Sequence, residues 1–374
     1  MKKIAYFTVL FCLAVFSVFS EDVILVGTSS MQSGPAAFYG LSTSKGYQAY
    51  LNEINANGGV NGKQIKRIQY DDVYNPDSCA FYTSKLNEED KVLALVAYVG
   101  TPTMNQAIPY IDKTRIPTIG AYTGGEFLYS KLHPSFFTFK PAYSTEAYEL
   151  TLKLIDYKKF KKIAVFYQDD AYGLSGMKGV NKALREKGLE IAVKGKNLRD
   201  SIDVTEAVKE ISAAAPECVI LLSTIKPNQA FLNEWKKIGL KAEFAVITGG
   251  GPDFLKDKLP DMMEGALCSQ AVPLYSDLSN PAAKEYNEVL TKYFPETKTD
   301  YVGFEGFLNA KFFVEILKKI EGDLSRENLI KTIENIKDLD IGLGSKISFA
   351  ADNHCGSNKV WMVEIKGGKY SVVQ

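Results

Sequence analysis

Histidine is scarce in this chain, and the sequence patterns of common enzyme active sites are missing. The 374 residues include two histidines, His133 and His354, and neither forms a pattern with a nucleophile. The chain also lacks Gly-x-Ser-x-Gly, a Walker A loop, and Gly-x-Gly-x-x-Gly after a strand. The run at 249–251 has the wrong spacing and is interpreted as a plain loop. We therefore predict a protein that is not an enzyme, has no catalytic residues and needs no cofactor.

An excess of charge of either sign is missing too. The chain carries 44 basic and 44 acidic residues, so its formal net charge is zero, and the basic residues form no blocks. This balance argues against nucleic acid as a partner. Two acidic pairs, at 71–72 and 169–170, follow predicted strands and could bind a metal ion. Paired acids at such places more often cap turns, so no metal site is expected.

Beyond its first residues, the chain has no hydrophobic run long enough to cross a membrane. Lys2 and Lys3 precede a nearly continuous apolar segment at 4–19, which is shorter than the roughly 20 residues of a spanning helix. Small residues follow, so we predict a signal peptide over 1–20 that is cleaved near Ser20 and Glu21. The alternative is an N-terminal anchor that is retained.

Cysteine is sparse after this segment. Four cysteines remain and none lies near another in sequence, so spacing leaves open whether they pair; they are Cys79, Cys218, Cys268 and Cys355. Cys218 begins an apolar strand, and a buried free thiol is expected there.

What is present is a regular alternation of short apolar runs with amphipathic stretches. The apolar runs lie at 23–26, 92–99, 116–119, 163–167, 218–222 and 244–248. This alternation is typical of βαβ units and predicts parallel sheets. The length favours two domains, and two similar halves are visible, so the fold class predicted is α/β with two doubly wound lobes. Strands are also expected at 346–349, 359–365 and 369–373.

Candidate binding groups follow the predicted strands, where parallel sheets hold their ligands. After 92–99, Thr101 fits a helix N-cap and Pro102 the first helical position, so free N–H groups and a hydroxyl there suit a carboxylate. The alternative is a simple cap. Tyr39, Tyr122 and Tyr172 each come just past a strand end. We interpret them as walls of a cleft, although single tyrosines there more often pack at a rim.

Several segments together resemble the type I periplasmic binding proteins of branched-chain amino acid ABC transporters. They are Ser33-Gly34-Pro35 with Tyr39-Gly40, the turn Asn57-Gly58-Gly59-Val60-Asn61-Gly62, Tyr70-Asp71-Asp72, and Tyr167-Gln168-Asp169-Asp170-Ala171-Tyr172-Gly173. The resemblance implies lobe 1 over 22–141 and 273–349, lobe 2 over 142–272 and 350–374, and a three-segment hinge. It also implies a monomer in the periplasm that captures an amino acid or related small carboxylate for ABC permease subunits. The alternative is a ligand-binding sensory module for a membrane receptor.

The resemblance also implies the ligand-binding residues. Thr101 and the loop with Tyr122 and Thr123 match the positions that hold the carboxylate, and Tyr39 and Tyr172 match tyrosines of the cleft. Thr248 stands where the family has the acid that meets the ligand's ammonium group, and Thr224 where it has another tyrosine. Glu305 is the acid expected to replace the missing one; its alternative is dipole stabilisation at a helix start. Tyr74 and Gly100 occupy the places of the family's first-lobe disulfide.

Overall fold

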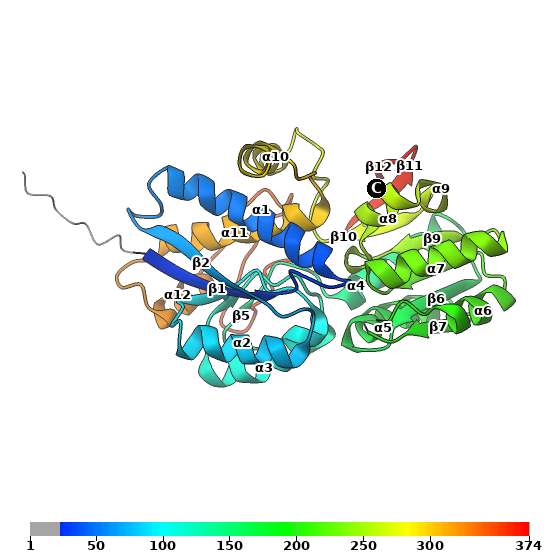
Figure 1. Ribbon diagram of the computed structural model, residues 1–374, viewed down its shortest axis with the longest axis horizontal. Coiled ribbons are helices and arrows are strands. Elements are labelled where there is room, and N and C mark those ends of the chain that lie inside the picture. The colour runs from blue at the N-terminus through cyan, green and yellow to red at the C-terminus, as the bar shows by residue number, and fades with distance from the viewer. Residues whose placement is uncertain (1–22, 200, 374) are drawn as a thin grey trace, which may run out of the picture.

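The computed structural model describes residues 23–199 and 201–373, and it forms two lobes that lie side by side (Figure 1). The first lobe contains a parallel five-stranded sheet in the order β2-β1-β3-β4-β5. Its strands are β1 (Val23–Ser30), β2 (Gln64–Asp71), β3 (Ala94–Val96), β4 (Thr118–Ile119) and β5 (Phe136–Phe137). Two layers of helices cover this sheet: α1 (Ala37–Ala56), α10 (Pro281–Tyr293), α11 (Tyr301–Lys319) and α12 (Arg326–Glu334) on one face, and α2 (Pro76–Glu88) and α3 (Thr101–Thr114) on the other.

The second lobe contains a seven-stranded sheet in the order β12-β11-β10-β9-β8-β6-β7. Its strands are β6 (Ile163–Gln168), β7 (Lys194–Asn197), β8 (Cys218–Leu222), β9 (Glu243–Val246), β10 (Leu267–Gln270), β11 (Trp361–Lys366) and β12 (Lys369–Val372). Helices α4 (Tyr143–Asp156) and α5 (Ala171–Glu186) cover one face, and α6 (Thr205–Ala213), α7 (Ile225–Ile238), α8 (Pro252–Lys258) and α9 (Pro260–Met263) the other. Two short 3₁₀ turns complete the chain, η1 (Glu126–Leu128) and η2 (Thr248–Gly250).

The two sheets share one winding pattern. The order β2-β1-β3-β4-β5 reappears in the second lobe as β7-β6-β8-β9-β10, all parallel, and antiparallel β11 and β12 are added at one edge. Strands such as β8 are buried throughout and purely apolar, as expected of a sheet covered on both faces. The prediction of an α/β fold with two parallel-sheet lobes is confirmed.

A Tyr-Gly pair lies in the first turn of the helix that follows the first strand of each sheet, α1 after β1 and α5 after β6, for a steric reason. A Cβ on Gly40 would lie 1.7 Å from the carbonyl oxygen of Met31, and a Cβ on Gly173 would lie 2.1 Å from that of Gln168. Only glycine lets the first helical turn approach the end of the preceding strand so closely. The neighbouring tyrosines, Tyr39 and Tyr172, are thereby fixed where the two lobes face each other.

The chain crosses between the lobes from β5 to α4, from β10 to α10 and from α12 to β11, and the first and last of these crossings are paired. Thr138 and Cys355 form a parallel bridge. The Thr138 N–H donates to the His354 carbonyl at 3.1 Å, and the Gly356 N–H donates to the Thr138 carbonyl at 2.7 Å. This pairing joins the two segments into one strip of backbone between the lobes. The lobe boundaries at 141, 272 and 349 stay a prediction.

Several local predictions differ from the structure. The stretch 346–349 is not a regular strand, because Ile347 forms only an isolated bridge to Leu339 and the surrounding chain is a loop. All four cysteines of the described residues are free, and Cys218 is fully buried as expected. The predicted signal peptide lies outside the described residues. Among the helices that the model describes, none combines the length and apolar character of a membrane span.

Candidate functional site

A small cavity lies between the lobes and is walled by tyrosine rings. Its lining comes from both lobes: Met31, Tyr39, Tyr74, Val99, Gly100, Thr101, Tyr122, Tyr143, Tyr172, Thr224 and Gly249. Its volume is about 20 Å³, which is room for about one water molecule. The lobes are therefore closed on each other, and the cavity between them is too small for an amino acid.

The first lobe contributes the start of α3 to this cavity. Gly100, with φ of 112°, is the N-cap, and Thr101 is the first helical residue, so the expected N-cap role of Thr101 is wrong. A positive φ is accessible to glycine without strain, and the chain therefore enters the helix one residue earlier than predicted. The Thr101 hydroxyl lies 2.9 Å from the Thr123 hydroxyl, and the Thr123 oxygen accepts from the Gly125 N–H at 3.2 Å. A buried hydroxyl at a helix start with first-turn N–H groups is a suitable receptor for a carboxylate.

Tyrosines of the first lobe reach across to the second. The Tyr39 hydroxyl donates to the carbonyl of Gly249 at 2.6 Å, and the Tyr122 hydroxyl donates to that of Thr248 at 3.3 Å. Gln168 donates to the Tyr74 hydroxyl at 3.3 Å. Burial raises the pKa of these three phenols, so they act as neutral donors and acceptors. The closed arrangement is held by direct hydrogen bonds between the lobes.

The second lobe contributes a tyrosine, a threonine and a glycine. The Tyr172 hydroxyl donates to the carbonyl of Ser223 at 3.4 Å, within its own lobe. Gly249 lies against this ring, since an added Cβ would come within 2.8 Å of it. Thr224 precedes α7 and donates to the Gln168 side chain at 3.4 Å. Aromatic rings and backbone carbonyls thus dominate this wall.

The residues predicted from the sequence divide into two groups. Tyr39, Thr101, Tyr122, Tyr172 and Thr224 line the cavity together, whereas three others stand behind its lining. Those three are Thr123, Thr248 and Glu305.

Glu305 differs most from its predicted role. Its carboxylate is fully buried and accepts from the Lys140 ammonium group at 2.8 Å. Burial raises the pKa of Glu305, and the nearby Lys140 charge opposes that rise. The Lys140 ammonium in turn lies 4.5 Å from the centre of the Tyr122 ring. Glu305 is therefore the partner of a hinge lysine behind the cavity.

Sequence reasoning missed four lining residues besides Gly100 and Gly249. Tyr74 follows β2 by three residues, so the rule that found the other tyrosines applies to it as well. Met31 directly follows β1 and Val99 follows β3. Tyr143 starts α4 directly after a hinge crossing, and no strand end marks it.

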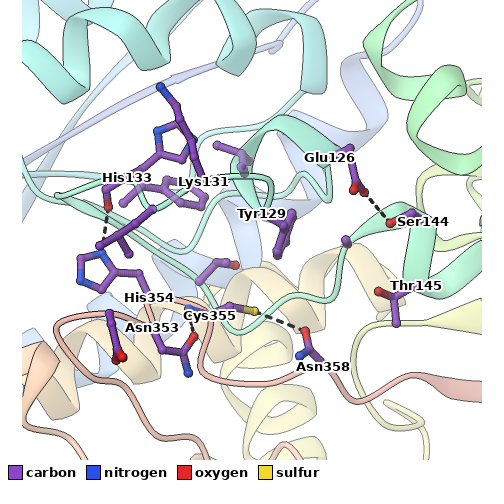
Figure 2. Close-up of a pocket in the computed structure, with 16 residues that line it drawn as sticks. Glu126, Tyr129, Lys131, His133, Ser144, Thr145, Asn353, His354, Cys355 and Asn358 are labelled. Atoms are coloured by element: carbon purple, nitrogen blue, oxygen red, sulfur yellow. Dashed lines mark hydrogen bonds between the residues drawn. The ribbon is translucent and has the colours of Figure 1, made fainter. Parts of the chain in front are cut away.

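A second pocket of about 340 Å³ lies beside the hinge and is a separate feature (Figure 2). Its two histidines and its cysteine already have partners within the protein. His133 Nδ1 lies 2.9 Å from Asp112 Oδ2, His354 Nδ1 lies 2.8 Å from the His133 carbonyl, and the Cys355 thiol contacts the Asn358 side chain at 3.6 Å. Burial raises the pKa of the Cys355 thiol to about 11. No group of three or more His, Cys, Asp or Glu residues that could hold a metal ion occurs in 23–199 and 201–373.

Known proteins match this chain over nearly its whole described length. A family model described as periplasmic binding protein matches residues 23–369. Leu/Ile/Val-binding protein homolog 7 of Brucella suis biovar 1 is 24% identical over 314 residues, which cover 78% of this chain and 75% of that protein.

Solved structures match the fold closely. A possible leucine/isoleucine/valine-binding protein from Rhodopirellula baltica SH 1 has a TM-score of 0.88 at 28% identity, and the match covers 95% of this chain and 97% of that one. A branched chain amino acid ABC transporter structure from Thermus thermophilus with bound valine has a TM-score of 0.86, covers 95% and 96%, and shares the fold at 21% identity. With the family match and the two-lobed parallel-sheet architecture, these findings show that the chain belongs to the periplasmic binding protein family and has its type I fold.

Proposed function

We propose that this protein is an extracytoplasmic solute-binding protein of an ABC importer, which captures an amino acid, branched-chain-like, or a related small carboxylate between its lobes. The observation that carries the proposal is the tyrosine-walled cavity into which the start of α3 faces. The names of the relatives, which refer to leucine, isoleucine and valine, agree with this class of ligand.

The carboxylate end of the ligand belongs at Thr101 in this proposal. The Thr101 and Thr123 hydroxyls lie 2.9 Å apart, so each can turn its hydrogen toward an anion. The helix dipole and free first-turn N–H groups of α3 add a favourable field. The Tyr39, Tyr122 and Tyr172 rings then enclose the rest of the ligand and exclude water.

Capture proceeds by closure of the two lobes around the hinge. With a closed cavity of about 20 Å³, ligand binds the separated lobes and wedges between the tyrosines as they come together. The liganded closed form is the shape that we propose permease subunits in the membrane recognise. We place the protein in the periplasm as a monomer whose signal peptide is cleaved near Ser20 and Glu21.

Calorimetric titration with the standard L-amino acids and small carboxylates tests the proposal. Thr101→Val should weaken the best carboxylate ligand by about 1 to 3 kcal/mol, because a buried charged group loses a hydrogen bond. Thr103→Val is the matched control. Thr103 is also buried in the first turn of α3 but does not line the cavity, and its hydroxyl is occupied by the Val99 and Gly100 carbonyls at 3.1 and 3.0 Å.

The results distinguish an error in the position of the site from an error in the proposed function. Equal affinity of folded Thr101→Val and wild type would remove Thr101 from the site. Absence of binding to every amino acid and carboxylate would overturn the proposed function. Scattering should show a smaller radius of gyration with saturating ligand, if the free protein in solution populates the separated lobes.

A further inference from the structure

A buried glutamate of the second lobe stands at the place where the sequence comparison found no acid. Glu146 lies in the first turn of α4 and is fully buried. Its Oε2 accepts from the Thr248 N–H at 3.1 Å and from the Thr248 hydroxyl at 2.6 Å. It also accepts from the Ser269 hydroxyl at 3.0 Å. The carboxylate therefore occupies the environment of residue 248, but it arrives from a helix instead of the strand-end loop.

The other oxygen of this carboxylate is unused. Glu146 Oε1 is buried and has no hydrogen-bond partner in the part of the chain that the structure describes, as is also true of Glu305 Oε1, but only Glu305 has a charged partner on its other oxygen. The three donors on Oε2 are uncharged groups. A buried carboxylate oxygen without a partner is expensive, and an ammonium group is the partner that compensates it best.

Residues next to Glu146 and next to its hydrogen-bond partner Thr248 line the cavity between the lobes. Tyr143 precedes Glu146 by three residues, on the same face of α4, and it lines the cavity. Thr248, which binds Glu146, is followed in the chain by Gly249, another lining residue. The Thr248 carbonyl accepts from the hydroxyl of Tyr122. The negative charge of Glu146 contributes to the raised pKa of Tyr143 and Tyr122. Glu146 thus lies close to residues that line the cavity, although it is not itself part of the lining.

The neighbouring charges do not supply the missing partner. Lys140 is the basic residue of this buried cluster, and its ammonium group pairs with Glu305 Oε2. The cluster of Glu146, Glu305 and Lys140 therefore holds two acids against one base. A ligand ammonium would balance the charge.

We infer that Glu146 is the residue that recognises the ligand's ammonium group, through its free Oε1, so that the site prefers α-amino acids over simple carboxylates. The inference rests on the proposed function. In this arrangement the ligand lies across the cleft, with its carboxylate at the start of α3 in the first lobe and its amine at α4 in the second. The two ends of a zwitterion then bind to different lobes, which links recognition of the amine to closure.

The test compares each L-amino acid with its des-amino counterpart, for example L-valine with 3-methylbutanoate and L-phenylalanine with 3-phenylpropanoate. Wild type should prefer the amino acid. Glu146→Gln keeps the shape and the acceptor for the Thr248 N–H but removes the charge. It should weaken amino acid binding about 30-fold or more while changing des-amino binding by less than about threefold.

Glu305→Gln is the matched control, because it neutralises the other buried acid of the same cluster. Its two affinities should change together, and melting temperatures confirm that both variants fold. Three outcomes would overturn the inference while the proposed function stands: wild type that binds both ligand classes equally, Glu146→Gln that loses both equally or neither, or a selective loss in Glu305→Gln alone. If wild type binds no ligand of either class, the proposed function fails and the inference fails with it.

Discussion

The two lobes are wound in the same way but present different chemistry to the cleft. Each places a Tyr-Gly pair in the helix after its first strand and a threonine at the start of the helix after its third strand, Thr101 in one and Thr224 in the other. The Thr101 side of the first lobe offers hydroxyls and a helix start, which favour an anion. The second lobe offers carbonyls and, behind them, a carboxylate, which favour a cation. This difference is the basis of our inference that the two lobes bind opposite ends of a zwitterion.

The two buried glutamates make the same contrast in charge. Each leaves its Oε1 without a hydrogen-bond partner among the described residues, but Glu305 Oε2 accepts from the Lys140 ammonium group, whereas Glu146 Oε2 has neutral donors only. Lys140 lies in the hinge segment, so the first-lobe acid is compensated from inside the protein. Glu146, the acid of the second lobe, has no such base, and we infer that the ammonium group of a ligand compensates its charge.

Removal of Lys140 should have the largest effect on stability, because it abolishes the charge difference between the two glutamates. In Lys140→Met both acids would be buried without a base, and we expect a loss of about 3 to 5 kcal/mol in the free energy of unfolding. Urea denaturation measures it. The double variant Lys140→Met with Glu305→Leu should recover most of the loss, because an apolar pair can replace a buried ion pair. A single variant as stable as wild type would show that the Lys140 charge is dispensable.

The close contact between strand end and helix that the two lobes share depends on Gly40 in one lobe and Gly173 in the other. Gly40→Ala and Gly173→Ala should each lower the free energy of unfolding by about 3 kcal/mol, because the new methyl group collides with backbone that cannot move aside. Leu41→Ala and Leu174→Ala are the controls, since these neighbouring side chains are largely exposed. Equal stability of a glycine variant and its control would contradict the steric explanation for the repeated pair.

Closure itself should depend on pH through Asp253, which joins α8 of the second lobe to α11 of the first. Its carboxylate accepts from the Tyr301 N–H at 2.9 Å and from the Tyr275 hydroxyl at 3.1 Å. Burial, and then the charge of Asp300, raises its pKa from 3.8 to about 7. The hydrogen bond from Tyr301 and the charge of Lys256 act in the opposite direction.

The sign of the effect follows from these values. Separation of the lobes hydrates Asp253 and returns its pKa toward 3.8, so the closed form holds a proton that the open form releases. Closure is then most favoured below pH 4 and weakens as the pH rises through about 7, by about 1 to 3 kcal/mol. Scattering between pH 5 and 8 should show expansion as the pH rises. Asp253→Asn should flatten this dependence, and an equal slope in the variant would assign it to Asp300 or another acid.

Much of the fold could be predicted from the sequence because central strands such as β8 are buried on both faces and form continuous apolar runs, whereas the edge strands β2 and β7 carry polar residues and form no such run. Three cleft tyrosines could also be predicted from the sequence. Ligands bind at the ends of parallel strands, and Tyr39, Tyr122 and Tyr172 lie there. Tyr143 and Glu146 follow a hinge crossing and gain their position only when three chain segments come together. The pairing of Glu305 with Lys140 spans 165 residues, and no local pattern encodes it.

The smallest expected effect distinguishes Tyr39 from Tyr172, the equivalent cleft tyrosines of the two lobes. Tyr39→Phe removes a 2.6 Å hydrogen bond between the lobes and leaves the buried Gly249 carbonyl short of its donor, so the free energy of unfolding should fall by about 1 kcal/mol. Tyr172→Phe should cost less than about 0.5 kcal/mol, because its 3.4 Å contact stays within one lobe and the Ser223 carbonyl keeps the Asn228 side chain at 2.7 Å. Urea denaturation ranks the two, and scattering should show expansion in the Tyr39 variant alone. Equal losses, or expansion in both, would mean that the hydroxyls play the same part in the two lobes.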